Sequence, residues 1–288
     1  MPFSASLFSY LNKKIPTPSE LLDGTAIVVI TGGSSGIGAS LIKSIRKLKP
    51  ELIICNLSRT QPDDFLSSYD HHFTADLAQP NAIADCATRL FDCLQMAPAG
   101  KLVLINNSGI GDYGRAQDLE RAKQLELLAI NVRAVLDLSY RLLPNLLARG
   151  GAVVNIASTA AFQPTAYLAS YGASKAFLLN WTLALNEELR DTSARAIAVC
   201  PGPTRTAFVK SAGFESAPLD AVGANWMSMT ADAVAAETLS GLGRRSAVIV
   251  PGWKNRWLVR LSSVLPLSWR TRLSARLMER LRLGALKD

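Results

Sequence analysis

A tyrosine and a lysine, Tyr171 and Lys175, are the two residues of this sequence with the clearest capacity for acid–base chemistry. On a helix, residues four positions apart share one face, with Cβ atoms about 5–6 Å apart. A free tyrosine has a pKa of about 10, too high for ready proton exchange at neutral pH, and a neighbouring ammonium group favours the phenolate. Because such a pair also arises by chance, it is informative only together with the elements that would position it.

The stretch Ala26–Gly38 carries the clearest structural pattern. Ala26–Ile30 is a short β-branched run, which is typical of a buried parallel strand. Glycines follow at positions 32, 36 and 38, and apolar residues then recur at helical spacing until Pro50 ends the segment. Free N–H groups and the positive end of the helix dipole meet at such a turn, so the pattern predicts a phosphate site rather than a simple connection.

Further apolar runs alternate with amphipathic segments along the chain. The predicted strands are Leu52–Leu57, His71–Ala75, Leu102–Ile105, Ala152–Ala157, Ala196–Cys200 and Val248–Val250. The predicted helices are Asn81–Leu94, Glu120–Leu147 and a segment from Tyr171 to about Arg190. This alternation predicts an α/β fold, a Rossmann-type doubly wound parallel sheet of about seven strands with helices on both faces. Ligands of such sheets bind at the switch point, which the first and fourth strands flank here.

The glycine turn resembles that of the short-chain dehydrogenase/reductase family, whose fingerprint is Thr-Gly-x-x-x-Gly-Ile-Gly. Every position of this fingerprint is filled, by Thr31, Gly32, Gly36, Ile37 and Gly38. The run Asn106-Asn107-Ser108-Gly109 is similar to the family's Asn-Asn-Ala-Gly turn, with a serine in the third place. The resemblance covers residues 24–252.

Four further residues match the family's catalytic set in order and approximate spacing: Asn131, Ser158, Tyr171 and Lys175. In the reaction that the resemblance implies, hydride reaches a carbonyl carbon and negative charge develops on the oxygen. Tyr171 is then expected to act as the acid in reduction and the base in oxidation, while Ser158 donates a hydrogen bond to the same oxygen. Lys175 is expected to lower the pKa of Tyr171 and to hold the nicotinamide ribose. For Asn131 a structural bond to the neighbouring strand and a water held for a proton relay both stay open.

The resemblance also implies a set of cofactor-binding residues at the ends of the strands. These are Thr31, Gly32, Ser34, Ser35, Gly36, Ile37, Gly38, Ser58, Arg59, Asp76, Leu77, Asn107, Ser108, Gly109, Tyr171, Lys175, Pro201, Gly202, Thr204 and Thr206. The second strand ends near Arg59, with no acidic residue before Asp63. Because an acid here favours NAD and an arginine accommodates the 2′-phosphate of NADP, the sequence predicts NADP(H) over NAD(H).

The predicted function is an NADP(H)-dependent oxidoreductase that interconverts a carbonyl and an alcohol. A non-catalytic NADP-binding sensor or scaffold on the same fold is the alternative, because fold alone does not determine function. The presence of both Tyr171 and Lys175 favours the enzyme. A hydrolase built on Ser158 lacks a suitable histidine, since the sequence contains only His71 and His72, and these two have no further ligand cluster for a metal.

The segment Ala207–Met229 lies where the family has its substrate lid. It is rich in large apolar residues: Phe208, Val209, Phe214, Leu219, Trp226, Met227 and Met229. Its acidic residues are Glu215 and Asp220. This composition favours a lipophilic ketone, aldehyde or keto-lipid, and with it a role in lipid metabolism. The alternative is that the apolar residues merely pack the lid onto the body.

The 288-residue chain divides into an N-terminal extension, 1–23, the catalytic domain, 24–252, and a basic extension, 253–288. The last segment holds nine basic and two acidic residues, and so most of the net charge of +8. Two helical patterns in it combine Trp and Leu with arginines, a composition typical of an interfacial membrane helix. Packing over the substrate crevice or on a subunit partner is the alternative. Nucleic-acid binding is not expected, because no groove-reading motif is present.

The remaining features predict a cytoplasmic protein with possible membrane association through residues 253–288. The first residues lack a basic start and a sustained apolar stretch, so they do not form a convincing signal peptide. No run approaches the roughly 18 apolar residues of a membrane span. Cys55, Cys86, Cys93 and Cys200 lack metal-ligand spacing and are expected to be reduced core residues. The family resemblance implies a homo-oligomer, either a dimer or a tetramer.

Overall fold

Seven parallel strands form the central sheet of the computed structural model, which describes residues 22–61, 70–208, 212, 228–243 and 246–285. The strands are β1 (Thr25–Thr31), β2 (Ile53–Ser58), β3 (His71–Thr74), β4 (Lys101–Asn106), β5 (Gly151–Ile156), β6 (Ala194–Val199) and β9 (Val248–Ile249). Their order across the sheet is β3-β2-β1-β4-β5-β6-β9, and every neighbouring pair is parallel. The predicted doubly wound sheet is confirmed, with β1 beside β4 at the switch point.

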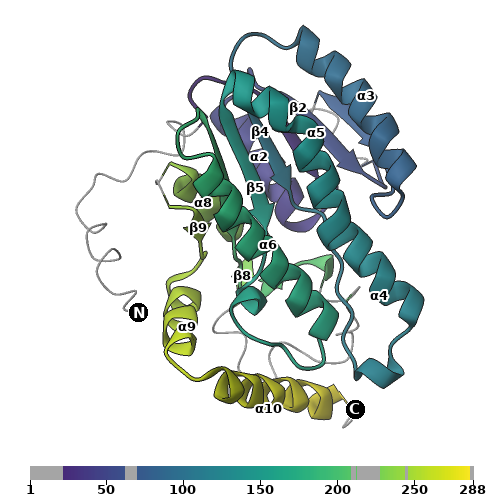
Figure 1. The fold of residues 1–288 in the computed structure, drawn as a ribbon, viewed down its shortest axis with the longest axis vertical. Coiled ribbons are helices and arrows are strands. Elements are labelled where there is room, and N and C mark those ends of the chain that lie inside the picture. The colour runs from purple at the N-terminus through teal and green to yellow at the C-terminus, as the bar shows by residue number, and fades with distance from the viewer. Residues whose placement is uncertain (1–21, 62–69, 209–211, 213–227, 244–245, 286–288) are drawn as a thin grey trace, which may run out of the picture.

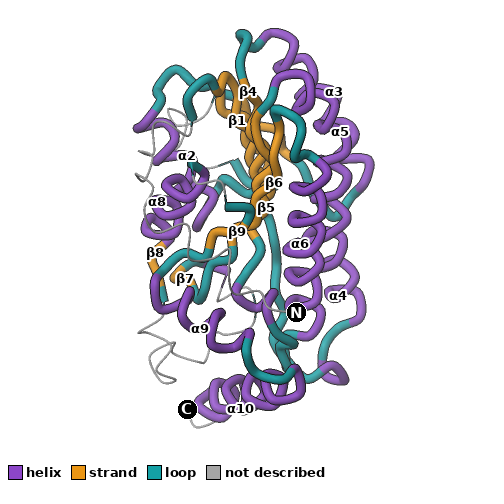
Figure 2. Tube along the Cα trace, turned by 60° about the vertical axis from the view of Figure 1, so that its left-hand side comes forward, coloured by secondary structure: helices purple, strands orange, loops and turns teal. Residues whose placement is uncertain are grey.

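Helices cover both faces of the sheet, as the edge-on view shows (Figure 2). One face carries α2 (Gly36–Leu48) and α8 (Ala231–Leu242); the other carries α3 (Pro80–Met96), α5 (Ala134–Arg149) and α6 (Ala169–Glu188). Successive side chains of a strand point to opposite faces. In β1, Val28 and Ile30 therefore pack in the cluster that includes Leu41 and Ile42 of α2, while Val29 packs in the cluster on the other face. This double burial explains why the strands are continuous apolar runs.

The predicted continuous helix over 120–147 is wrong in its middle. α4 (Arg121–Leu128) is followed by a π-helical turn, Ala129–Arg133, before α5 begins. The polar residue of this turn, Asn131, is fully buried and bonded to the backbone that follows β4. Single π turns in α-helices are frequent at functional sites, because they turn one side chain out of the regular register.

Two short pairs of elements complete the described chain. β7 (Thr204–Arg205) and β8 (Met229–Thr230) form a small parallel sheet. α9 (Trp253–Ser263) and α10 (Leu267–Ala285) form an L-shaped arm below α6 (Figure 1). α9 contacts the 3₁₀ turn η3 (Thr159–Phe162), which follows β5.

Some expectations lie outside the described residues. They include the extension 1–21, Asp63, and most of the expected lid, namely 209–211 and 213–227. Within the part of the chain that the structure describes, no helix is both long and apolar enough to cross a bilayer. The four cysteines are free and buried, and no cluster of three or more potential metal-ligating residues occurs among the described side chains.

Candidate active site

The carboxyl ends of β1 and β4 are joined by a compact hydrogen-bond network. The Thr31 hydroxyl accepts hydrogen bonds from the backbone N–H groups of Asn107 and Ser108, each at 3.0 Å. The Asn107 amide donates to the carbonyl oxygens of Thr31 and Gly32, also at 3.0 Å. The network fixes the glycine turn against the next strand before any ligand binds.

Two glycines of the turn meet different physical requirements. Gly36 has a φ of +54°, in the left-handed region that other residues rarely adopt. At Gly38 an added Cβ would lie 2.3 Å from the Gly32 carbonyl oxygen and 2.5 Å from the Asn107 amide nitrogen. A side chain at position 38 would therefore push α2 away from the turn. The first turn of α2 contains no acidic residue, so its N–H groups and the positive end of its dipole suit an anion.

Asn56 is a site residue whose function sequence reasoning missed. It lies in β2, is fully buried, and accepts a hydrogen bond from the Gly33 N–H at 3.0 Å through its side-chain oxygen. Asn56 therefore fixes the other side of the glycine turn. The signal was a polar residue inside an otherwise apolar strand, which must find a partner when buried.

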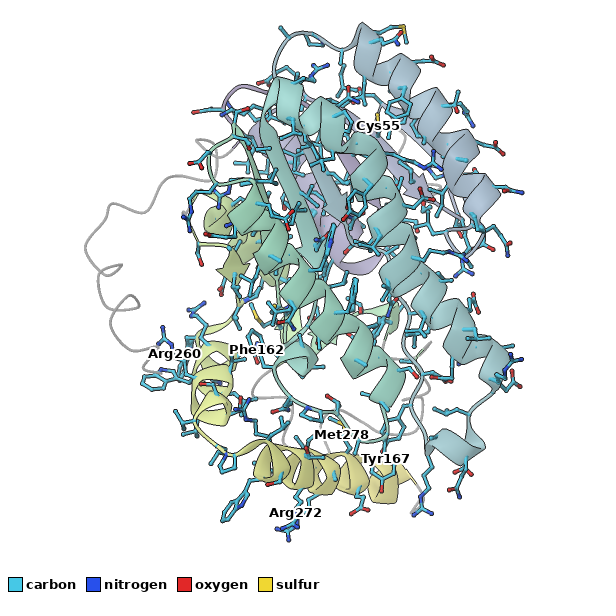
Figure 3. All side chains as sticks on the ribbon, viewed as in Figure 1. Cys55, Phe162, Tyr167, Arg260, Arg272 and Met278 are labelled. Carbon is cyan, nitrogen blue, oxygen red and sulfur yellow. The ribbon has the colours of Figure 1, made fainter. Side chains whose placement is uncertain are left out.

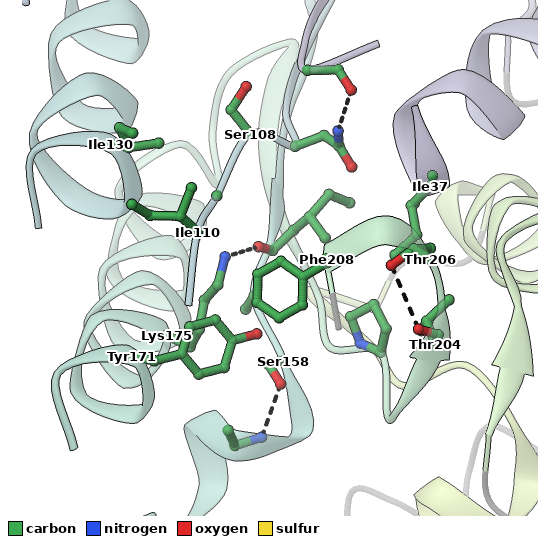
Figure 4. Close-up of a pocket in the computed structure, with 18 of the residues that line it drawn as sticks. Ile37, Ser108, Ile110, Ile130, Ser158, Tyr171, Lys175, Thr204, Thr206 and Phe208 are labelled. Carbon is green, nitrogen blue, oxygen red and sulfur yellow. Dashed lines mark hydrogen bonds between the residues drawn. The ribbon is translucent and has the colours of Figure 1, made fainter. Parts of the chain in front are cut away.

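The glycine turn and the neighbouring strand ends line a cavity of about 730 Å³ (Figure 4). Its wall contains most of the expected cofactor residues: Gly32, Ser34, Ser35, Gly36, Ile37, Ser58, Arg59, Asp76, Leu77, Asn107, Ser108, Gly109, Tyr171, Lys175, Pro201, Gly202, Thr204 and Thr206. Ser158 also lines it. Thr31, Gly38 and Asn131 are not in the wall and support it from behind. The structure thus brings the predicted residues to one site.

Tyr171, Lys175 and Ser158 lie at one part of this cavity, as Figure 4 shows. Tyr171 and Lys175 come from α6, with the Lys175 ammonium 5.8 Å from the centre of the Tyr171 ring. Ser158 follows β5, and its hydroxyl accepts a hydrogen bond from the Ala160 N–H at 3.1 Å. The Lys175 ammonium donates to the Ile156 carbonyl oxygen at 2.8 Å, so β5 determines where the lysine head lies.

Burial shifts the pKa values of Tyr171 and Lys175, and that of Tyr171 differs from what the sequence predicted. Burial raises the pKa of Tyr171 above its usual value, although its hydrogen bond with Ser158 acts in the opposite direction. Burial lowers the pKa of Lys175 to about 8. The structure therefore shows a raised tyrosine pKa in place of the expected lowering, because burial disfavours the phenolate. Burial also raises the pKa of the nearby Cys200 thiol to about 12, which leaves that thiol protonated at neutral pH.

Asn131 has the structural role that the sequence left open. Its side-chain oxygen accepts from the Ile110 N–H and its amide donates to the Ile110 carbonyl oxygen, both at 2.9 Å. The amide also donates to the Ser174 hydroxyl at 3.1 Å. A Cβ added at Gly109 would be 3.2 Å from both the Asn131 oxygen and the Lys175 ammonium, so Asn131 lies beside the lysine head.

The far end of the cavity is apolar and comes from distant parts of the chain. The Phe208 ring lies 5.5 Å from that of Tyr171, and Leu168 and Ile110 extend the wall. α9 contributes Leu258, and α10 contributes Leu277 and Met278. Sequence reasoning placed Leu258 and Leu277 on amphipathic helices but missed Met278, Gln163 and Thr165 as wall residues. No local pattern marks these positions, because each becomes part of the wall only through a long-range contact.

Comparisons with known proteins agree with this geometry. The family model described as short chain dehydrogenase matches residues 26–216. The ketoacyl reductase HetN of Nostoc sp. is 31% identical over 179 residues, which are 61% of this chain and 62% of HetN. The chain therefore spans less than two thirds of the length of this relative.

Two solved structures extend the comparison. A short-chain dehydrogenase of Sphingobium yanoikuyae, in complex with NADPH, is 28% identical with a TM-score of 0.67, covering 84% of this chain and 96% of that one. The bulky-bulky ketone specific alcohol dehydrogenase of Comamonas testosteroni is 25% identical with a TM-score of 0.63, again covering 84% and 96%. The chain belongs to the short-chain dehydrogenase/reductase family of oxidoreductases.

Proposed function

We propose that this protein interconverts a lipophilic carbonyl compound and its alcohol with NADP(H), using Tyr171 as the acid and base. The observation that carries the proposal is the single cavity, which runs from the glycine turn past Tyr171 and Ser158 to an apolar end. One end has the N–H groups and helix dipole that suit phosphates, and the other end has the surface that suits hydrocarbon.

Each polar group of the site has a defined part in this proposal. The bound nicotinamide supplies or accepts the hydride. The Tyr171 hydroxyl gives its proton to the carbonyl oxygen during reduction, and the raised pKa keeps the hydroxyl in the protonated form that this step requires. The Ser158 hydroxyl donates a hydrogen bond to the same oxygen, where negative charge develops. Lys175 holds the nicotinamide ribose and places positive charge beside Tyr171.

The preference for NADP(H) rests on Arg59. This residue follows β2, is exposed, and lines the cavity beside Ser58. An arginine at the end of the second strand accommodates a 2′-phosphate. The Sphingobium relative, solved with NADPH, supports the same choice. We expect at least tenfold tighter binding of NADPH than of NADH, and Arg59→Asp should narrow or invert that ratio. Arg121→Asp, on the remote helix α4, is the matched control; a wild-type preference for NADH contradicts the assignment.

The apolar end of the cavity supports the lipophilic substrate. Phe208, Leu168 and Leu277 offer hydrocarbon surface close to the proton donor. HetN is named a ketoacyl reductase and the Comamonas enzyme a bulky-bulky ketone specific alcohol dehydrogenase, and these two names support a large carbonyl substrate for this chain. The alternative, that the apolar residues of the lid only pack on the body, concerns residues that mostly lie outside the described part of the chain.

The decisive experiment follows NADPH oxidation with ketones and aldehydes of increasing chain length. We expect kcat/KM to rise with the length of the carbon chain, because each added methylene leaves water for the apolar wall. NADPH binding without turnover of any carbonyl would favour the non-catalytic sensor. Turnover that is best with small polar carbonyls would retain the enzyme and reject the lipophilic substrate.

A further inference from the structure

The arm formed by α9 and α10, residues 253–285, is fastened to the body by its inner face. The Tyr113 hydroxyl donates to the Met278 carbonyl oxygen at 2.6 Å, and the Tyr167 hydroxyl donates to the Glu279 carboxylate at 2.7 Å. The Arg270 guanidinium donates to the Phe162 carbonyl oxygen at 3.2 Å. Figure 3 shows Met278 on the side of α10 that faces the body. These contacts confirm that the arm packs over the substrate end of the cavity.

The same packing leaves large apolar side chains of the arm exposed to solvent. Seven of them are more than half exposed: Trp253 61%, Trp257 63%, Leu261 65%, Val264 76%, Leu267 61%, Trp269 65% and Leu273 59%. They begin on α9, continue across the corner between the helices, and end on α10. We call these seven residues the outer row. So many exposed large apolar side chains on two consecutive helices indicate an interaction site.

Basic side chains accompany the outer row. The Lys254 ammonium lies 5.6 Å from the centre of the Trp253 ring, and the Arg260 guanidinium lies 6.0 Å from that of Trp257. Arg272 and Arg276 are exposed on α10, and Figure 3 shows Arg272 pointing away from the body. Glu279, the acidic residue of the arm, is instead bonded to Tyr167. The surface that the arm offers is therefore both apolar and positive.

We propose that the outer row lies on an anionic lipid bilayer, with its tryptophans and leucines at the boundary between headgroups and acyl chains. Aromatic and leucine side chains flanked by lysine and arginine are the composition of an interfacial helix. A second copy of the chain fits this surface less well, because it would bring the same excess of positive charge. Anionic headgroups supply the complementary charge, and each basic group near them strengthens binding about fivefold.

The position of the arm gives this contact a consequence for the reaction. Leu258, Leu277 and Met278 of the same helices line the substrate end of the cavity. A bilayer against the outer row therefore contacts the same two helices that line the substrate end of the cavity. This part of the inference rests on the proposed function, and it assigns the membrane as the source of a lipophilic substrate.

Co-sedimentation with vesicles tests the contact directly. Full-length protein is mixed with vesicles of phosphatidylcholine alone, or of phosphatidylcholine with phosphatidylserine, at low and high salt. We expect pelleting with the anionic vesicles that weakens as salt screens the charges. Protein that stays in the supernatant with anionic vesicles at low salt overturns the proposal. Binding that is equal on neutral and anionic vesicles overturns the electrostatic part of it.

Matched variants locate the surface. Arg272→Glu should weaken binding about tenfold or more, whereas Arg89→Glu changes the net charge equally on α3, at the opposite end of the molecule (Figure 1), and should leave binding unchanged. Trp269→Ser should weaken binding to a similar extent, whereas Met96→Ser removes an apolar side chain that is 76% exposed on α3 and should have no effect. Circular dichroism melts verify that each variant is folded. Equal losses in the Arg272 and Arg89 variants contradict a surface on the arm.

Two further measurements distinguish the membrane contact from the proposed reaction and from self-association of the chain. Tyr171→Phe should still pellet with anionic vesicles, so vesicle binding can succeed even where the proposed reaction fails. Sedimentation velocity without lipid tests for a second copy on the outer row. An oligomer that dissociates in Trp269→Ser, together with no vesicle binding by the wild type, would assign the outer row to self-association and overturn the membrane contact.

Discussion

The two ends of the cavity are built in different ways. The phosphate end consists of the glycine turn and the neighbouring strand ends, joined by short backbone and side-chain hydrogen bonds around Thr31, Asn56 and Asn107. The substrate end consists of Phe208 and the arm, which is fastened mainly by hydrogen bonds from Tyr113, Tyr167 and Arg270. The phosphate end is therefore part of the sheet and its connecting turns, whereas the substrate end is formed by helices that pack against the body. We therefore expect changes at the phosphate end to weaken cofactor binding and so lower turnover of every substrate, and changes at the substrate end to alter which substrate is preferred.

Tyr171 lies between the two ends, and its removal should have the largest effect. Tyr171→Phe deletes one oxygen and is expected to lower kcat by about 1,000-fold, because a positioned acid contributes about 100- to 10,000-fold. NADPH affinity, measured by fluorescence titration, should change less than about twofold, since the phenol is not needed to hold the phosphates. Tyr140→Phe, at a residue that is 60% exposed on α5, is the control. Substantial turnover in Tyr171→Phe eliminates the proposed acid.

Gly38→Ala tests the phosphate end of the cavity. The new Cβ would lie 2.3 Å from the Gly32 carbonyl oxygen, so α2 must move away from the turn. We expect NADPH affinity to fall by about 100-fold, because a displacement of this size at a binding turn costs that much. Leu277→Ala at the other end should leave NADPH affinity unchanged and alter the preference among carbonyl chain lengths. Similar losses of NADPH affinity in both variants would contradict the division into two ends.

The pH dependence follows from Lys175. Burial lowers its pKa from 10.5 to about 8, so the folded protein loses this proton as the pH rises through about 8, while an unfolded chain keeps it to higher pH. The proposed roles need the ammonium form, so kcat/KM for NADPH should be flat below pH 8 and fall about tenfold per pH unit above it. The Lys175→Arg variant keeps its charge over this pH range, so its kcat/KM should not fall above pH 8. If kcat/KM of the arginine variant falls as in the wild type, another group causes the fall.

Tyr113→Phe should have the smallest effect, because it removes only one of the hydrogen bonds that hold the arm at the substrate end. Loss of the bond to the Met278 carbonyl oxygen costs about 1 kcal/mol. We expect KM for long-chain carbonyls to rise about fivefold, with NADPH affinity and turnover of short carbonyls unchanged. Steady-state kinetics over a chain-length series measure this, with Tyr140→Phe as the matched control. An equal rise in KM for short and long substrates would indicate that the arm does not bind the chain.

Much of the phosphate end could be predicted from the sequence. A strand, three spaced glycines and an amphipathic helix are local patterns, and the pair Tyr171 and Lys175 depends only on the spacing of one helix turn. The alternation of strands with helices predicts parallel strands, and the Rossmann-type order places the first strand beside the fourth. Asn56 was missed as a partner of the turn because a strand pattern shows that a polar residue is unusual, and not which backbone group it bonds.

Only the tertiary structure decided the pKa of Tyr171 and which surfaces of α9 and α10 are buried. The pKa of Tyr171 depends on burial and on its hydrogen bond with Ser158, and both arise from elements that the fold brings together. An amphipathic pattern in residues 253–285 indicates that part of each helix is apolar, but burial of apolar surface is non-directional and does not name its partner. Leu258, Leu277 and Met278 reached the cavity, and the outer row stayed exposed, because the body offers one surface and the arm has more than one apolar side.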